Sequence, residues 1–142
     1  MITVNHLLDG KGRQLFSIGP KESVLRAIEM MAEKHVGALL VMERGQLLGV
    51  ISERDYARNV ILKNRSSHDT PVADIMSAPV ITVTPDHSVH HCMQLMTEKR
   101  IRHLPVVRAD QVVGMLSIGD LVKATIEEQT QHIEELERYI AG

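Results

Sequence analysis

The chain contains one sequence pattern twice. When the sequence is shifted on itself by 65 residues, positions 18–56 align with positions 83–121 without a gap. Several aligned pairs exchange one aliphatic residue for another, such as Ile28/Met93, Val36/Ile101 and Ile51/Leu116, and the identical pairs include Ser23/Ser88, Gly49/Gly114, Ser52/Ser117 and Asp55/Asp120. Because a pattern that recurs at a fixed offset indicates one supersecondary unit used repeatedly, the sequence predicts two copies of the same small fold.

Both copies have the same predicted order of elements, β-α-β-β-α. Apolar residues at helical spacing predict the first helix of each copy, and short apolar runs predict its strands. Polar and glycine residues at 43–46 predict a hairpin turn between two of these strands. The expected elements of the first copy are strand 15–18, a helix that starts near Pro20 and Ser23 and includes Val24, Ala27, Ile28 and Met31, strands 38–42 and 47–51, and helix 52–63. Those of the second copy are strand 80–83, helix 88–99, strands 104–107 and 112–116, and a helix from 117.

A unit of this size buries too little apolar surface to be stable alone. We therefore expect an α/β (α+β) fold in which the two units pack sheet to sheet with pseudo-twofold symmetry. The expected division is a first domain at 8–64, a linker at 65–74, a second domain at 75–124 and a C-terminal helix at 125–142.

The predicted C-terminal helix carries apolar residues at nearly heptad spacing. They are Val122, Ile126, Ile133, Leu136 and Ile140. This stripe packs either on the body of the same chain or on a second copy of it.

The composition argues against several functions. The formal net charge is −2 and aromatic residues make up 2% of the chain, so neither phosphate neutralisation nor base stacking on aromatic side chains is supported. A single cysteine excludes an intramolecular disulfide framework, and no apolar run is long enough to cross a bilayer. Residues 1–13 lack the apolar core of a signal peptide. We expect a cytoplasmic protein that binds neither nucleic acid nor membrane.

Three short segments carry a family resemblance. Residues 49–55 (GVISERD), 114–120 (GMLSIGD) and 103–107 (HLPVV) resemble the motifs of cystathionine-β-synthase (CBS) domains. The tandem, over about 15–62 and 75–124, resembles a CBS pair, or Bateman module. The resemblance implies clefts between the two units that bind an adenosine-containing ligand such as AMP, ATP or NAD/NADH. It also implies a homodimer.

The resemblance assigns roles residue by residue. The ribose-binding residues would be Ser52, Asp55, Ser117 and Asp120. The base-binding residues would be Ile18, Ala38, Leu39, Ile81, Thr82, His103, Leu104 and Pro105. The phosphate-binding residues would be Arg54, Arg58, Arg100 and Arg102, for which a solvated surface arginine is the alternative.

The Ser-x-x-Asp motif has two compatible interpretations. An ionised carboxylate accepts both hydroxyls of a ribose in charge-assisted hydrogen bonds. The same spacing at a helix start forms a capping box. Gly49 and Gly114, inside strand runs, indicate either a close approach by a ligand or backbone, or a β-bulge.

The two copies differ at positions that would line the ligand sites. Pro105 replaces Leu40, and Gly119 replaces Arg54. Because proline has no N–H to donate in a strand, we expect the two sites to bind different ligands or to differ in affinity.

Metal binding and catalysis have little support in the sequence. His87 and His91 have the i, i+4 spacing of many metal ligands, but the neighbouring Cys92 aligns with Ala27 on the apolar face. Neither a P-loop nor a Gly-x-Gly-x-x-Gly turn is present. The sequence therefore favours a non-catalytic ligand sensor without a metal, acting on a protein partner that it does not identify. The alternatives are an oligomerisation scaffold with vestigial clefts and, less favoured, an enzyme or nucleic-acid binder.

Overall fold

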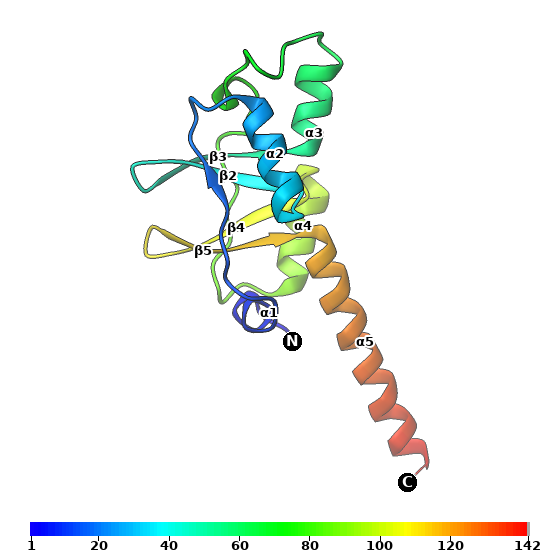
Figure 1. Cartoon of the computed structure of the whole chain (residues 1–142). Coiled ribbons are helices and arrows are strands. Elements are labelled where there is room, and N and C mark those ends of the chain that lie inside the picture. Colours follow the sequence, from blue (N-terminus) through cyan, green and yellow to red (C-terminus); the bar gives the residue numbers. More distant parts are fainter. Residues whose placement is uncertain (142) are drawn as a thin grey trace. The chain divides into compact units, whose positions relative to one another are not determined.

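The computed structural model describes residues 1–141 and divides into two compact units, each containing one repeat (Figure 1). The first-repeat unit is Leu15–Ile81. The second-repeat unit joins Met1–Gln14 to the chain from Thr82 onward. Each has the mixed helix and strand composition that the repeat predicts.

The first-repeat unit is built on a three-stranded sheet of order β1-β2-β3. Strand β1 runs parallel to β2, and β2 runs antiparallel to β3. Its elements are β1 (Ser17–Ile18), α2 (Val24–Lys34), β2 (Ala38–Glu43), β3 (Gln46–Ser52), α3 (Glu53–Tyr56), the π-helix η1 (Ala57–Ile61) and the 3₁₀ helix η2 (Val72–Asp74). The helix expected at 52–63 is thus a short α-helix that continues as a π-helix.

The second-repeat unit repeats this order around a two-stranded sheet, β4-β5. Its elements are α1 (Val4–Lys11), α4 (Val89–Lys99), β4 (His103–Arg108), β5 (Gln111–Ser117) and α5 (Ile118–Ala141). The helix expected from residue 117 and the expected C-terminal helix form one continuous element, α5. None of the helices within residues 1–141 is long and apolar enough to cross a membrane.

The same local signals begin and end the first helix of each repeat. Ser23 Oγ accepts from the Arg26 N–H at 3.1 Å, and Ser88 Oγ accepts from the His91 N–H at 3.0 Å. These N-caps satisfy backbone donors that have no partner within the helix. At the other end, His35 and Arg100 adopt the left-handed conformation, so the repeat extends to the C-caps.

Matching apolar positions form the two cores. Val24, Ala27 and Met31 of α2 are buried, as are the aligned Val89, Cys92 and Met96 of α4. Burial raises the pKa of the Cys92 thiol to about 11, which keeps it protonated and unreactive at neutral pH. The prediction that Cys92 belongs to the core is confirmed.

The prediction of a strand at 80–83 is wrong: this segment forms only a single β-bridge, between Val83 and Val106. In the first-repeat unit the Leu40 N–H donates to the Phe16 carbonyl and extends the parallel pairing. The aligned position in the second repeat is Pro105, which has no N–H to donate. The pairing there is limited to Val83 N to Pro105 O at 3.1 Å and Val107 N to Val83 O at 2.8 Å.

Helix α1 was not anticipated from the sequence. Its N-cap is Thr3, whose Oγ1 accepts from the His6 N–H. The Val4 N–H donates to the His87 carbonyl, and the Asn5 N–H donates to the Pro85 carbonyl, both at 2.8 Å. Leu8 is fully buried, so this helix completes the core of the second-repeat unit.

Candidate ligand-binding sites

Each Ser-x-x-Asp motif lies where the second strand of a hairpin turns into a helix. Ser52 caps α3: its Oγ accepts from the Asp55 N–H at 3.2 Å, and Asp55 Oδ2 accepts from the Ser52 N–H at 2.9 Å. The Asp120 N–H donates to Ser117 Oγ at 3.2 Å, and the Ser117 N–H donates to Asp120 Oδ2 at 2.8 Å. The capping-box interpretation is therefore confirmed in both repeats.

The capping box leaves part of each carboxylate available. Both backbone hydrogen bonds end on Oδ2, and each carboxylate oxygen has two lone pairs. Asp55 Oδ1 accepts one further hydrogen bond, from Ser77 Oγ at 3.1 Å. Capping thus does not exhaust the acceptor capacity that a ribose diol would need.

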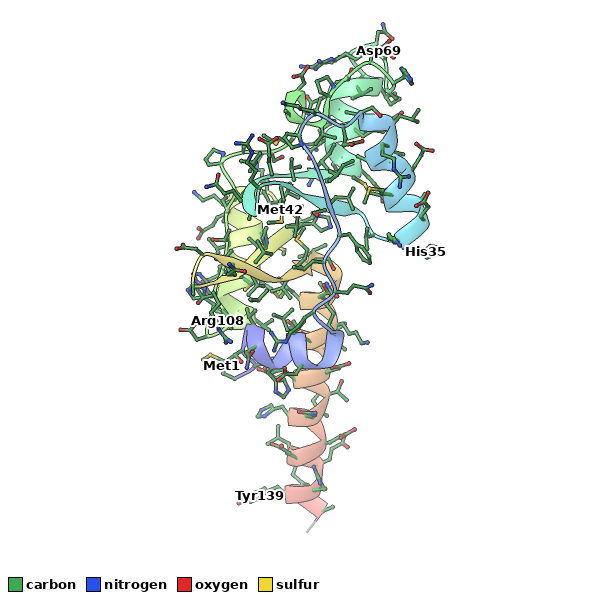
Figure 2. The ribbon with its side chains drawn as sticks, turned by 60° about the vertical axis from the view of Figure 1, so that its left-hand side comes forward. Met1, His35, Met42, Asp69, Arg108 and Tyr139 are labelled. Carbon is green, nitrogen blue, oxygen red and sulfur yellow. The ribbon has the colours of Figure 1, made fainter. Side chains whose placement is uncertain are left out.

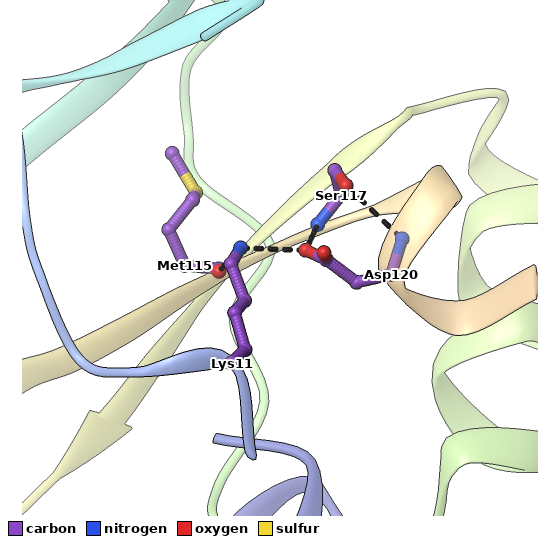
Figure 3. A network of polar contacts seen from close by, with 4 residues as sticks. All are labelled: Lys11, Met115, Ser117 and Asp120. Carbon is purple, nitrogen blue, oxygen red and sulfur yellow. Dashed lines mark hydrogen bonds and ion pairs between the residues drawn. The ribbon is translucent and has the colours of Figure 1, made fainter. Parts of the chain in front are cut away.

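Lys11 is the partner of Asp120 that the sequence analysis missed (Figure 3). Its Nζ donates to Asp120 Oδ2 and to the Met115 carbonyl oxygen, each at 2.5 Å. Burial alone raises the pKa of Asp120, but the hydrogen bonds from Lys11 and Ser117 and the charge of Lys11 outweigh it, so the net shift lowers the pKa. Asp120 is therefore ionised at neutral pH. Lys11 and Asp120 lie 109 positions apart in the sequence, so local spacing cannot reveal this pair.

The two strand glycines make room for side chains. A Cβ on Gly49 would lie 2.7 Å from Met76 Sδ, and a Cβ on Gly114 would lie 2.7 Å from Leu8 Cδ2. A register shift lies beside each glycine, between Val41 and Met42 and between Val106 and Val107. The bulge is thus confirmed, and the close approach comes from side chains and, at Gly49, also from the Ser77 carbonyl.

The strand pairing brings some base-binding candidates next to the ribose-binding candidates. Ala38 is the register partner of Ser52, and His103 is the register partner of Ser117. Pro105 pairs with Met115, whose carbonyl contacts Lys11.

The side chains of three other base-binding candidates are inaccessible to a ligand. Ile18, Leu39 and Leu104 are buried, so they would present mainly backbone groups to a base. Ile81 ends the first-repeat unit and Thr82 begins the larger part of the second.

The phosphate-binding candidates are distributed over both units. Arg54 on α3 is half-buried, and Arg58 on η1 is exposed. Arg100 is the C-cap of α4. The carbonyl of Arg102 accepts from the Ile118 N–H at 2.9 Å, which places the backbone of Arg102 at the start of α5.

One hollow of the first-repeat unit is lined by neighbours of the candidate residues and by none of the candidates themselves. It measures about 560 Å³ and lies where the C-terminal end of α2 meets the start of α3. Its lining is Ile28, Met31, Ala32, His35, Val36, Gly37, Glu53 and Tyr56. Neither Ser52 nor Asp55 contributes to it.

The histidines near the start of α4 interact with each other and with the backbone. The rings of His87 and His91 stack with centroids 4.4 Å apart. His87 Nδ1 accepts from the Thr84 N–H at 2.9 Å, so this nitrogen is already used. In the described part of the chain, no three His, Cys, Asp or Glu side chains are grouped as metal ligands would be.

A family profile, curated relatives and solved structures all relate this chain to CBS-domain proteins. The CBS domain profile matches residues 12–61 and 72–127. The CBS domain-containing protein CBSX3, mitochondrial, of Arabidopsis thaliana is 44% identical over 126 residues, which cover 85% of this chain. The match spans 61% of the length of that relative.

Solved structures agree. A putative signal-transduction protein with CBS domains from Burkholderia ambifaria is 46% identical, with a TM-score of 0.86 over 89% of this chain and 96% of that one. The CBS domain protein PAE2072 from Pyrobaculum aerophilum, solved in complex with AMP, is 28% identical, with a TM-score of 0.74 over 84% of this chain and 89% of that one. The chain therefore belongs to the CBS domain family and carries two CBS domains in tandem.

Proposed function

We propose that this protein is a regulatory ligand-sensing module that binds an adenosine-containing nucleotide of the AMP, ATP or NAD/NADH type. The observation that carries the proposal is the hydrogen bonding of the Asp55 and Asp120 carboxylates. Asp55 and Asp120 each cap a helix through Oδ2 and keep acceptor capacity on Oδ1. A carboxylate held in this way is ready to accept hydrogen bonds from the two hydroxyls of a ribose.

The strand register supports the same assignment. Ala38 and His103 lie directly across the ladder from Ser52 and Ser117. A base attached to a ribose at either aspartate would meet the first residues of β2 or β4. The N-terminus of α5, beside Asp120, favours an anionic group, which suits a phosphorylated ligand.

The proposed role is non-catalytic. A relative with 28% identity was solved with AMP, and the sequence carries no recognisable catalytic constellation. A sensor requires that the ligand bind two conformations with different affinity. Its output would be a change in affinity for a protein partner.

A thermal-shift screen tests the proposal. Purified protein is heated with AMP, ADP, ATP, NAD, NADH or S-adenosylmethionine, with ribose 5-phosphate as the ligand that lacks a base. A ligand at 100 times its Kd stabilises the native state by about 2.7 kcal/mol. We expect at least one adenosine ligand to raise the melting temperature when ribose 5-phosphate does not. The absence of a shift with every ligand at millimolar concentration would contradict the proposal.

A second candidate function, an oligomerisation scaffold, is supported by the surface of α5. All side chains from Ile126 to Ala141 are exposed, and this stretch includes Ile126, Ile133, Leu136 and Ile140. Figure 2 shows the side chains around Tyr139 standing away from the helix. We propose that this apolar stripe pairs with the same stripe of a second copy. A homodimer is compatible with either function, so the ligand screen decides between them.

A further inference from the structure

The two aspartates differ in the side chain that donates to their carboxylates from outside the hairpin and its helix. In the first-repeat unit the neutral hydroxyl of Ser77 donates to Asp55. In the second-repeat unit the ammonium group of Lys11 donates to Asp120. Ser77 follows Met76, which packs on Gly49, and Lys11 lies shortly after Leu8, which packs on Gly114. The additional donor is therefore a neutral hydroxyl on Asp55 Oδ1 in one repeat and a cationic ammonium group on Asp120 Oδ2 in the other.

Lys11 is held in position by an anchored helix. Leu8, one turn earlier on α1, fills the space beside Gly114. The backbone of α1 is bonded to Pro85 and His87. The Gly12 N–H donates to the Leu8 carbonyl at 2.7 Å, and Gly12 adopts a φ of +100° that glycine tolerates readily. The packing and hydrogen bonds of α1 thus position the Lys11 ammonium group beside Asp120 in the ligand-free protein.

The ammonium group keeps capacity for another acceptor. A lysine ammonium has three N–H donors, and within residues 1–141 its recorded acceptors are Asp120 Oδ2 and the Met115 carbonyl. The Lys11 side chain is 35% exposed, so solvent or a ligand can reach it. The charge of Lys11 also offsets the charge of Asp120, which would otherwise repel an anionic ligand.

We propose that Lys11 is a specificity-determining residue of the Asp120 site: it binds the phosphate of the ligand, so that this site selects nucleotides over nucleosides. The inference rests on the proposed nucleotide binding and adds Lys11 to it. At the Asp55 site the matching contact comes from the Ser77 hydroxyl, so position 77 supplies no such selection. This contact is one respect in which the two sites differ.

The experiment isolates the Asp120 site. An Asp55→Asn background weakens the other site, and calorimetric titration then measures the Kd of AMP and of adenosine. In this background, Lys11→Met should weaken AMP about 10- to 150-fold, the range for a lost hydrogen bond to a charged group, and leave adenosine nearly unchanged. Lys11→Arg keeps the charge and should retain most of the preference for AMP. Lys123→Met, which removes an exposed lysine of α5, is the charge-matched control and should change neither Kd.

Each other result has a definite meaning. An equal loss of AMP and adenosine would overturn the inference, because Lys11 would then only position Asp120 or α1. Tighter AMP binding by Lys11→Met would also overturn it, because Lys11 would then compete with the ligand. If AMP binds the background protein and Lys11→Met leaves its Kd unchanged, the inference fails and the nucleotide site stands. If neither AMP nor any other nucleotide of the thermal-shift screen binds the wild type, both fall.

Discussion

Leu8 occupies the space in which a side chain at residue 114 would lie. A Cβ added to Gly114 would come within 2.7 Å of Leu8 Cδ2 and 2.8 Å of Leu8 Cδ1. Leu8 belongs to α1 and Gly114 to β5, so this contact joins the start of the chain to the hairpin of the second repeat. The glycine is required here by packing, since its φ is ordinary.

Gly114→Ala should therefore destabilise the protein by about 1–3 kcal/mol, the usual cost of overpacking a core. Leu8→Ala should cost about 2–5 kcal/mol through the cavity it leaves. The double variant should lose less unfolding free energy than the two single variants lose in sum, because removing the Leu8 side chain makes room for the new methyl group at residue 114. Urea unfolding of the four proteins measures the cycle, and strict additivity would show that the two residues do not compete for space.

The repeat and its caps could be predicted because they depend on local pattern. Helical spacing located α2 and α4, each of which begins directly after the aligned Ser23 or Ser88. The capping interpretation of Ser52 and Ser117 also follows from spacing alone. These elements agree with the structure because neighbouring residues along the chain determine them.

The remaining features depend on contacts between distant segments. Lys11 reaches Asp120 only because α1 packs on the second repeat, which no spacing within residues 114–120 encodes. The apolar run at 80–83 predicted a strand that does not form. To foresee its absence, one would have to know that this run pairs with the segment around Pro105, which lies 22 positions beyond Val83 and lacks an N–H. The sequence did contain one weak signal for α1. Residues 4–8 resemble residues 72–76, and this alignment matches Leu8 with Met76.

Asp120→Asn separates helix capping from ligand binding. Asparagine keeps an acceptor oxygen for the Ser117 N–H, so the loss should be smaller than the 0.5–2 kcal/mol of a deleted cap, and the lost ion pair with Lys11 is partly exposed and adds about 0–1 kcal/mol. Nucleotide affinity at this site should fall about 10- to 150-fold, because one oxygen becomes a donor facing a hydroxyl. Calorimetry on the variant decides. Unchanged affinity and stoichiometry would leave Asp120 with a capping role only.

The Lys11–Asp120 pair predicts a pH dependence of stability. The pKa of Asp120 is lowered in the folded protein, so the unfolded state binds its proton at higher pH than the folded state does. The stabilisation from this group is present above the ordinary aspartate pKa of about 3.9 and is lost as pH falls through the lower folded value. The difference in unfolding free energy between wild type and Asp120→Asn should therefore shrink as pH falls below about 4. A difference that stays constant from neutral pH into this range would contradict the assignment.

The exposed stripe of α5 predicts a homodimer that one substitution weakens. Light scattering should give about twice the chain mass of 15.9 kDa. Ile133→Asp should shift the equilibrium toward monomer, because it places an unpaired charge in the interface. Gln131→Asp adds the same charge on the opposite side of the helix from the stripe and is the matched control. A monomer at every micromolar concentration of wild type would rule out pairing through α5.

Calorimetric titration of AMP into wild type and into the Asp55→Asn/Asp120→Asn double variant tests nucleotide binding by the two Ser-x-x-Asp motifs most directly. Wild type should bind AMP, and the double variant, shown by its unfolding curve to be folded, should bind it at least about tenfold more weakly at both sites. Binding of AMP with the same affinity and stoichiometry by both proteins, or no binding of AMP, ATP, NAD or NADH by wild type at millimolar concentration, would contradict the account.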